Sequence, residues 1–288
     1  MISSVNVDNT EPHAFAAASG SSVEPYLARI RIFPVKSLDA IEVRQARVLK
    51  SGALEYDRKW ALFDHTGGYI NGKRYKTIHR LRSAMIPAAG KLSLKIGSEP
   101  REASFEIGRQ REELEQWLAG YFGTPVDVRE DIEQGFPDDP DSPGPTVISV
   151  ASLREVGGWF GLPVEEVRER FRANIEIDGV PAFWEDRLFG APGTVVPFRI
   201  GNVRFDGVNP CQRCAVPPRD SRTGREDEIF VRRFRELRKR TLPEWALASR
   251  FSHFYRLAVN TRLNSLGHDG VIRVGDKIEI LMPEQSRM

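Results

Sequence analysis

The sequence contains little cysteine: Cys211 and Cys214 are its only thiols in 288 residues. Two cysteines cannot build a disulfide framework, so a reduced pair in a reducing compartment is the simplest interpretation. They are also too few for an iron–sulfur cluster, which needs about four thiolate ligands. We therefore expect no iron–sulfur cluster in this chain.

The sequence also lacks a charge excess and long apolar runs. Its 42 Lys and Arg against 40 Asp and Glu leave a net charge of +2, which argues against wholesale attraction to nucleic acid or membranes. No stretch approaches the ~20 apolar residues that span a bilayer, and the N-terminus has no signal-peptide pattern. We expect a cytoplasmic protein without membrane contact, whose residues 1–23 form a flexible tail.

The composition that is present fits a globular protein, with 40% hydrophobic and 28% charged residues. Period-two alternation predicts many short strands, whereas apolar residues at helical spacing predict a few helices. The strands are expected over 26–35, 40–49, 59–64, 91–97, 102–108, 125–130, 146–149, 173–179, 195–207, 254–260 and 271–282. The helices are expected over 111–123, 150–161, 163–171 and 226–240, with Ser149 or Ser152 as an N-cap.

A stretch rich in Pro, Asp and Gly over 134–145 is the best candidate for a domain boundary. We therefore predict a mainly β fold with several helices (α+β), without the regular βαβ rhythm of a doubly wound sheet. A β-barrel-like domain over 24–140 would pack on a second β-barrel over 141–288.

The cysteine pair lies in "NPCQRCAVPPRDSRTG" and permits several chemistries. A redox dithiol needs the N-terminus of a helix, which Pro217 and Pro218 would break soon after Cys214. Structural zinc needs four ligands, but the five histidines are scattered and form no second pair. Beside Arg213, a thiolate is a good ligand for a softer metal. Two small buried thiols near a turn remain an alternative.

Candidate anion-binding residues occur in both halves of the chain. Lys36 and Ser37 follow a strand end, where an ammonium, a hydroxyl and free N–H groups can meet an anion. Arg58 opens another strand, and a basic cluster lies over 73–82. Arg172 and Asn174 are two residues apart at the entry to a strand, so alternation would place both on one face. These segments could converge as a phosphate-binding wall.

Two classes of ligand are disfavoured by the motifs. No Gly-x-x-x-x-Gly-Lys loop and no Gly-x-Gly-x-x-Gly turn is present, so the usual nucleotide carriers are not supported. The basic cluster over 73–82 has only Tyr69 and Tyr75 as flanking aromatics, which makes nucleic acid an unlikely partner.

These stretches together resemble a known family. "RIRIFPVKSLDAIEV" (29–43) and "LEYDRKWALFD" (54–64) resemble the N-terminal β-barrel of proteins with a molybdenum-cofactor sulfurase C-terminal (MOSC) domain. "FRANIEIDG" (171–179) and "FDGVNPCQRCAVPPRDSRTG" (205–224) resemble the MOSC domain itself. The likeness covers residues 26–285 and extends to the mitochondrial amidoxime-reducing component.

The resemblance implies a molybdenum cofactor, a molybdopterin whose dithiolene holds the metal together with one protein cysteine. That ligand would be Cys214, which would also be the catalytic centre, while Cys211 would be nearby and dispensable. Arg213 would flank the metal. The cofactor's phosphate and pterin would be met by Lys36, Ser37, Arg58, Arg172 and Asn174.

The resemblance also implies an activity and its partners. Members of the family reduce N-hydroxylated or N-oxygenated small molecules, with electrons from a haem or iron–sulfur protein. Because this chain has too few cysteines for a cluster, a separate ferredoxin-like or cytochrome-like donor is expected. The alternative is a sulfur carrier or cofactor-binding module with a persulfide on Cys214. Pyridoxal phosphate would then belong to a partner desulfurase.

Overall fold

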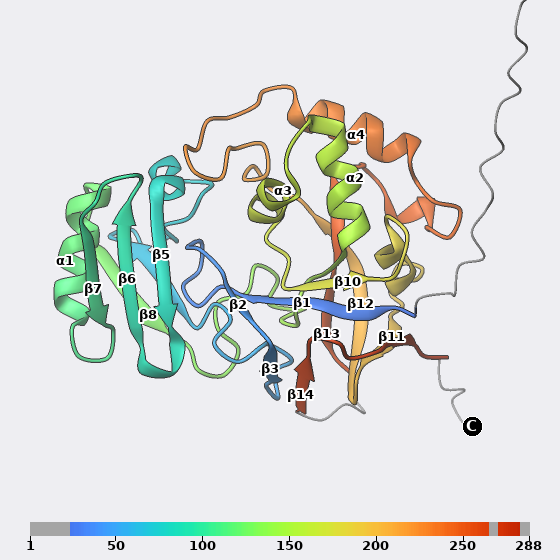
Figure 1. The fold of residues 1–288 in the computed structure, drawn as a ribbon, viewed down its shortest axis with the longest axis horizontal. Helices are drawn as coiled ribbons and strands as arrows, with labels where there is room; N and C mark the ends of the chain where they lie inside the picture. The colour runs from blue at the N-terminus through green and yellow to red at the C-terminus, as the bar shows by residue number, and fades with distance from the viewer. Residues whose placement is uncertain (1–23, 265–269, 283–288) are drawn as a thin grey trace, which may run out of the picture.

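The computed structural model describes residues 24–264 and 270–282 of the chain. It shows a mixed α+β molecule in which strands outnumber helices, as the sequence predicts (Figure 1). A large sheet and three helices form one part, and smaller sheets with one helix form the other. The tail expected over residues 1–23 lies outside the described residues.

The larger part is built on an eight-stranded sheet with the order β15-β11-β12-β13-β9-β10-β1-β2. A buried apolar cluster lies on this sheet and includes Ile30, Val147, Phe198 and Val259. The strands are β1 (Tyr26–Ile32), β2 (Ile41–Val43), β9 (Val147–Ser149), β10 (Ile175–Asp178), β11 (Val196–Ile200), β12 (Val203–Gln212), β13 (Arg256–Leu263) and β15 (Ile278–Ile280).

The smaller part has a core of its own around Leu94 and Leu118. Its only described α-helix is α1 (Arg111–Phe122), which ends at Gly123 in the left-handed conformation that glycine tolerates. Its strands form one antiparallel sheet of three and one of two. They are β4 (Trp60–Asp64), β5 (Leu81–Ile86), β6 (Lys91–Ile96), β7 (Glu102–Glu106) and β8 (Val126–Glu130).

The N-terminal strands do not stay within the smaller part. β1 pairs with β10 and β2 in the large sheet, and β3 (Gln45–Val48) pairs with β14 (Gly270–Arg273) near the other end of the chain. Residues 33–38 then lead from the large sheet to an isolated bridge between Val35 and Trp60 in the smaller part. The segment that carries Lys36 and Ser37 is therefore fixed to both parts.

Three α-helices cover the large sheet (Figure 1). They are α2 (Val150–Phe160), α3 (Val164–Phe171) and α4 (Phe230–Arg240), and their aromatic residues pack into a third buried cluster. Ser149 is the N-cap of α2, because its Oγ accepts a hydrogen bond from the Ser152 backbone N–H at 3.0 Å. The expected role of one of these two serines as a cap is confirmed.

Most expected strands are confirmed, but the runs expected over 40–49, 195–207 and 271–282 each divide into two strands. β5 was missed, because its sequence LRSAMI does not alternate regularly between polar and apolar residues. β12 runs on past the expected end at Gly207, through Pro210 and Cys211. The register of β12 shifts on both sides of Pro210, so the strand accommodates a residue that has no N–H to donate.

A buried carboxyl beneath α2 should make stability depend on pH. Burial, and to a lesser degree Asp186, raise the pKa of Glu185 to about 7. Its Oε2 accepts hydrogen bonds from Ser149 N and Ser152 Oγ. Because the folded chain binds this proton more tightly than the unfolded chain does, stability should fall as pH rises from about 4.5 to 7. The loss should be on the order of 3 kcal/mol.

Urea unfolding at pH 5 and pH 8 tests this expectation against Glu185→Gln, which keeps the acceptor oxygen and cannot ionise. We expect the variant to lose most of this pH dependence and to be more stable than the wild type at pH 8. Equal pH dependence in the two proteins would show that Glu185 does not titrate in this range.

The helices over the described ranges are all too short or too polar to cross a lipid bilayer.

Candidate functional site

Two adjoining pockets open where the smaller part meets the larger one, and Cys214 borders both. The walls of the two pockets share Arg58, Lys73, Asp138, Arg213 and Cys214. The first pocket is the more cationic, and it extends over Lys36, Ser37 and Arg172. Cys211 borders only the second pocket. Cys214 is therefore the thiol that both pockets reach.

The backbone around Cys214 is held by Tyr255, the residue just before β13. The Arg213 backbone N–H donates to the Tyr255 carbonyl at 3.1 Å, and the Tyr255 hydroxyl donates to the Cys214 carbonyl at 3.2 Å. No helix begins within residues 213–229, which confirms the expectation drawn from Pro217 and Pro218. A dithiol mechanism that depends on a helix N-terminus has no support here.

Arg213 distinguishes the two thiols. Its Nη1 donates to Cys211 Sγ at 3.2 Å and its Nη2 to the Phe171 carbonyl at 2.5 Å, and the guanidinium lies over the Phe171 ring. Its Nε is buried without a hydrogen-bond partner. Cys211 thus helps to hold Arg213, while Cys214 lines both pockets.

This contact predicts a graded effect at Cys211. Cys211→Ser keeps a weak acceptor for Arg213, whereas Cys211→Val removes it and leaves another buried N–H unpaired, at a cost of about 1–3 kcal/mol. We expect the Val variant to bind the cofactor at least about tenfold more weakly than the Ser variant. Cofactor retention after dialysis measures this difference, and equal retention in both variants would contradict the positioning role.

Three of the predicted site residues share an unusual backbone conformation. Ser37, Arg58 and Arg172 have positive φ angles of 74°, 51° and 52°. Such angles are uncommon outside glycine and cluster where a functional geometry is enforced by the surrounding structure. The three residues come from three separate segments of the chain, and all of them line the first pocket.

Lys36 is buried at the wall of the first pocket. Its Nζ donates to the Phe136 carbonyl at 2.8 Å and to Asp138 Oδ1 at 2.7 Å, and it lies 5.1 Å from the centre of the Tyr69 ring. Burial lowers the pKa of Lys36 although Asp138 opposes this effect. Asp138 comes from the Pro-rich loop between the two parts and places a carboxylate beside the expected anion site.

Arg58 is oriented by two neighbours. Its guanidinium pairs with Asp57 and donates to Asn174 Oδ1 at 3.4 Å. Asn174 is itself buried: its Oδ1 also accepts from Thr146 and its Nδ2 donates to the Arg31 carbonyl at 3.0 Å. Asn174 borders the second pocket, but its amide is already engaged by protein groups. Its observed contacts are those of a residue that positions Arg58.

Arg172 enters the first pocket as the C-cap of α3, not as part of a strand. The expectation that alternation places it on one face with Asn174 is wrong, because β10 begins only at Ile175. Its Nη2 donates to the Leu38 carbonyl at 2.6 Å, and its guanidinium lies 4.2 Å from the centre of the Phe33 ring. Burial, together with the nearby Arg58, lowers the pKa of Arg172 to about 10.

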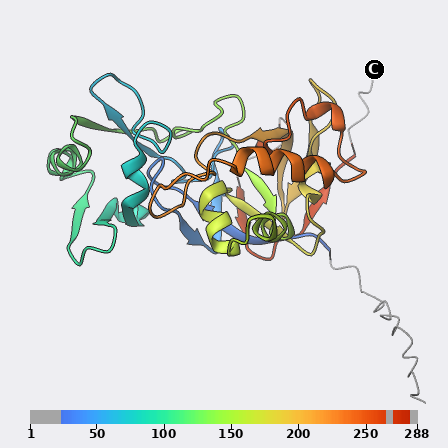
Figure 2. The same ribbon diagram turned by 90° about the horizontal axis from the view of Figure 1, so that it is seen from above.

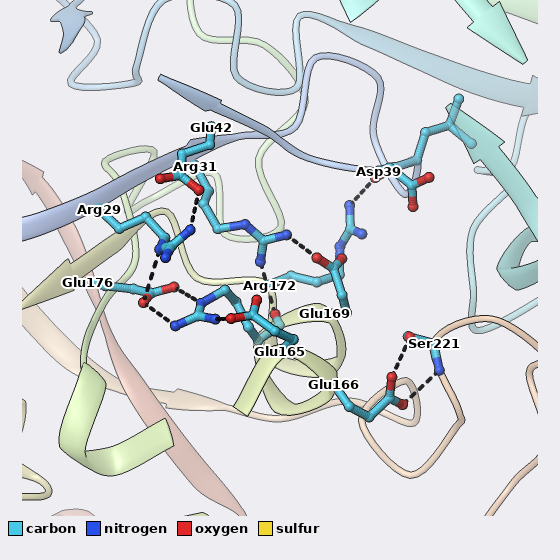
Figure 3. Close-up of polar contacts among 12 residues, drawn as sticks. Arg29, Arg31, Asp39, Glu42, Glu165, Glu166, Glu169, Arg172, Glu176 and Ser221 are labelled. Atoms are coloured by element: carbon cyan, nitrogen blue, oxygen red, sulfur yellow. Dashed lines mark hydrogen bonds and ion pairs between the residues drawn. The ribbon is translucent and has the colours of Figure 1, made fainter. Parts of the chain in front are cut away.

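An ion-pair network fixes the helix that carries Arg172. Figure 3 shows Arg31 of β1 reaching Glu169 of α3, and Arg29 of β1 beside Glu176 of β10. Glu176 also pairs with Arg168 of α3. These contacts connect β1, α3 and β10 next to the pocket. The position of Arg172 therefore depends on β1 near the N-terminus and on β10 in the middle of the chain.

The first pocket has an excess of positive charge. Its wall carries eight Lys or Arg side chains and three carboxylates. Among the described residues, no carboxylate lies within ion-pair distance of Lys73, Arg172 or Arg213, although most of the other cations have such a partner. Desolvated guanidinium groups without a counter-ion favour an anionic ligand.

The basic cluster over 73–82 is only partly at the site. Lys73, His79 and Arg82 line the first pocket, whereas Arg74, Lys76 and Arg80 do not. Burial and the nearby Arg219 and Arg172 lower the pKa of His79 to about 4, so its imidazole is neutral near pH 7. Sequence reasoning missed the pocket residues Asp138, Arg170 and Arg219. No local motif marks Asp138 or Arg170, because the fold brings them to the pocket. Arg219 lies in the stretch around the two cysteines, but sequence reasoning assigned it no role.

The residues fit a metal that brings its own ligands. Within 24–264 and 270–282, no group of three or more His, Cys, Asp or Glu side chains could hold a metal ion. The molybdopterin that the sequence resemblance implies would need one protein thiolate and an anion site for its phosphate. Cys214, with Arg172 and Arg213 lacking counter-ions beside it, supplies both requirements.

The arrangement defines a class of protein: a two-part α+β fold with a cysteine, Cys214, at a cationic pocket between its parts. Comparison with known families then places the chain. Residues 24–125 match the MOSC N-terminal beta barrel domain, and residues 146–279 match the MOSC domain. The chain is a MOSC-domain protein with the MOSC N-terminal barrel.

The curated relatives are molybdenum cofactor sulfurases. The human protein is 24% identical over an alignment of 289 positions, and the matched part is 81% of this chain and 31% of the relative. The protein of Drosophila grimshawi is 27% identical over 238 residues, covering 70% and 29%. This chain thus spans about a third of the length of these relatives. The likeness connects the chain with molybdenum-cofactor biology.

Proposed function

We propose that the protein binds a molybdenum cofactor through Cys214 and reduces N-hydroxylated or N-oxygenated small molecules with electrons from a separate donor protein. The observation that carries the proposal is the position of Cys214 at the junction of two pockets. One pocket has guanidinium groups without counter-ions, which suit the cofactor's phosphate. The other offers a route for a small polar substrate.

The residues of the chain would bind and orient the cofactor and neutralise the charge of its phosphate. Arg172 and Arg213, with Lys36 and the backbone at Ser37, would hold the cofactor's phosphate and pterin. Arg58 would be aimed by Asp57 and Asn174 into the same space. When bound, the molybdenum centre supplies the two-electron chemistry that removes oxygen from the substrate nitrogen. Asp138 would have to share Lys36 with the incoming phosphate.

The second pocket supports a polar substrate. Its wall includes the amides of Asn209 and Asn260 and the guanidinium of Arg256, and its apolar contribution comes mainly from prolines and one alanine. Asn260 Nδ2 donates to Asn209 Oδ1 at 3.1 Å and to Asp139 Oδ2 at 3.3 Å. A small molecule with hydrogen-bonding groups fits such a wall better than a large apolar one.

A second candidate function is favoured by the names of the relatives. A sulfur carrier would hold a persulfide on Cys214, or the protein would store the cofactor for delivery. The pyridoxal phosphate needed to release sulfur from cysteine would then belong to a partner protein. Both functions use the same thiol, so they differ in what Cys214 carries.

The test measures the metal, pterin and sulfur bound to protein purified from a molybdenum-replete host and from a tungstate-grown host. We expect one molybdenum and one pterin per chain in the first preparation. It should also reduce an amidoxime with a small-molecule electron donor, and the second preparation should be inactive. Cyanide-releasable sulfur on Cys214 without metal would instead identify the carrier, and folded protein without either would overturn both functions.

A further inference from the structure

The outer face of α4 carries an excess of positive charge. Five of its exposed residues are cations and one is an acid. At 100° per residue they fall on one side of the helix, while Phe230, Phe234 and Arg238 face the core. The exposed residues are Arg232, Arg233, Arg235, Glu236, Lys239 and Arg240.

Helix stability does not account for this face. Cations in the last turn, such as Lys239 and Arg240, interact favourably with the helix dipole. Arg232 and Arg233 lie in the first turn, where positive charge is unfavourable. Among the described residues, no carboxylate pairs with Arg232, Arg235 or Arg240. The first-turn arginines that oppose the dipole, together with exposed cations that lack a carboxylate partner, point to an acidic partner.

The buried face of the same helix leads to the candidate site. Phe234 packs edge-to-face on Tyr255 at 5.3 Å, and Tyr255 donates its hydroxyl hydrogen bond to the Cys214 carbonyl at 3.2 Å. Phe230 contacts Phe171, whose ring lies beneath Arg213. One layer of aromatic side chains therefore separates α4 from Cys214. A partner on the outer face would be roughly one helix diameter, ~10 Å, from that layer.

From this continuity we infer that the outer face of α4 is the docking surface for an acidic one-electron carrier protein. The inference rests on the proposed function, whose electron donor it describes. Two reduced carriers would each give one electron, and the substrate would take up two protons. An N-hydroxyl compound would thus become the amine and water, and both carriers would leave oxidised.

Other anionic partners fit the face less well. A membrane-bound helix needs an apolar face to insert, but the apolar face of α4 is buried in the core. Single-stranded nucleic acid requires stacking aromatics beside the charge, and the exposed residues of α4 include none. Figure 1 shows α4 at the top of the larger part, and Figure 2 shows it across the face seen from above, where a globular partner can reach it.

The experiment uses Arg232→Glu with Arg240→Glu in the cofactor-loaded protein. Arg235 is left unchanged because its charge acts on the pKa of Tyr255. The matched control is Arg101→Glu with Arg111→Glu, two exposed cations in the smaller part. The donors are a strongly acidic plant-type [2Fe–2S] ferredoxin and the soluble haem domain of a cytochrome b5. Donor reoxidation is followed at several salt concentrations.

We expect the α4 variant to lower the second-order rate constant for both donors by about tenfold or more at low salt. The difference should shrink as salt rises, the control should match the wild type, and activity with a small-molecule donor should be unchanged in all three. Equal rate constants in the α4 variant and the control would overturn the inference. Equal loss with the small-molecule donor would do so as well, since it would show a structural effect.

A binding measurement separates this inference from the proposed function. Calorimetry with the oxidised ferredoxin needs no turnover, and the α4 variant should bind at least about tenfold more weakly than the control. This result would stand even if no N-reduction were found. Equal ferredoxin affinity in variant and control would overturn the inference. A variant defective only toward anionic vesicles or RNA would identify another partner and overturn it too.

Discussion

Cys214→Ser is expected to lose molybdenum and to lower N-reduction by more than about 100-fold, while the fold stays intact. Residues that merely support a metal ligand typically contribute 10- to 100-fold, and the ligand itself should contribute more. A serine hydroxyl is a harder and weaker ligand for this metal than a thiolate. Metal content, pterin content and turnover with a small-molecule donor measure the effect.

Cys211→Ser is the matched control, because it makes the same atomic change three residues away. It should keep most of the metal and most of the activity, since a hydroxyl can still accept from Arg213. Equal losses in the two variants would argue for a mechanism that uses both thiols. Thermal unfolding of both variants would show whether either loss reflects misfolding.

Asp186→Ala should destabilise the protein by about 3–5 kcal/mol. Asp186 pairs with Arg238 of α4 in a region where the two side chains are 4% and 1% exposed. Arg238 also lies 4.0 Å from the centre of the Phe183 ring, and its Nε and Nη1 have no hydrogen-bond partner. Removing the carboxylate leaves a permanently charged guanidinium buried and unpaired, which typically costs this much.

Urea unfolding near pH 7 measures this loss, and Asp141→Ala is the control at an exposed aspartate. We expect the control to change the free energy of unfolding by less than about 0.5 kcal/mol. Replacing both partners, as Asp186→Leu with Arg238→Met, should restore much of the stability. A loss below about 1 kcal/mol in Asp186→Ala would show that the Arg238 charge finds solvent or another partner.

Local patterns in the sequence predict much of the fold. Alternation locates most strands, and the cap of α2 follows from Ser149 and its spacing to Ser152. Alternation does not determine which strands pair, since any apolar face can pack on another. β5 escaped detection because LRSAMI does not alternate regularly, and the second half of β12 because Pro210 usually ends a strand. The register shifts of β12 depend on its partner strand β13.

The candidate site could be predicted only in outline. The family motifs indicate Lys36, Arg58, Arg172 and Cys214, and the structure brings these residues to one pocket. The left-handed conformations at three positions are enforced by tertiary contacts, and sequence gives no signal for them. Asp138 lies in a loop whose composition indicates a turn. That loop crosses the pocket because the two parts pack together.

The pairing of β1 with β10, and of β3 with β14, has a consequence for how this protein can be divided. The boundary between the two family domains cuts across hydrogen-bonded strands rather than through a free linker. A fragment starting after residue 140 would leave the edges of β10 and β14 open, and open strand edges promote aggregation. The two domains should therefore be inherited, expressed and engineered as one unit, and the site between them exists only when both are present.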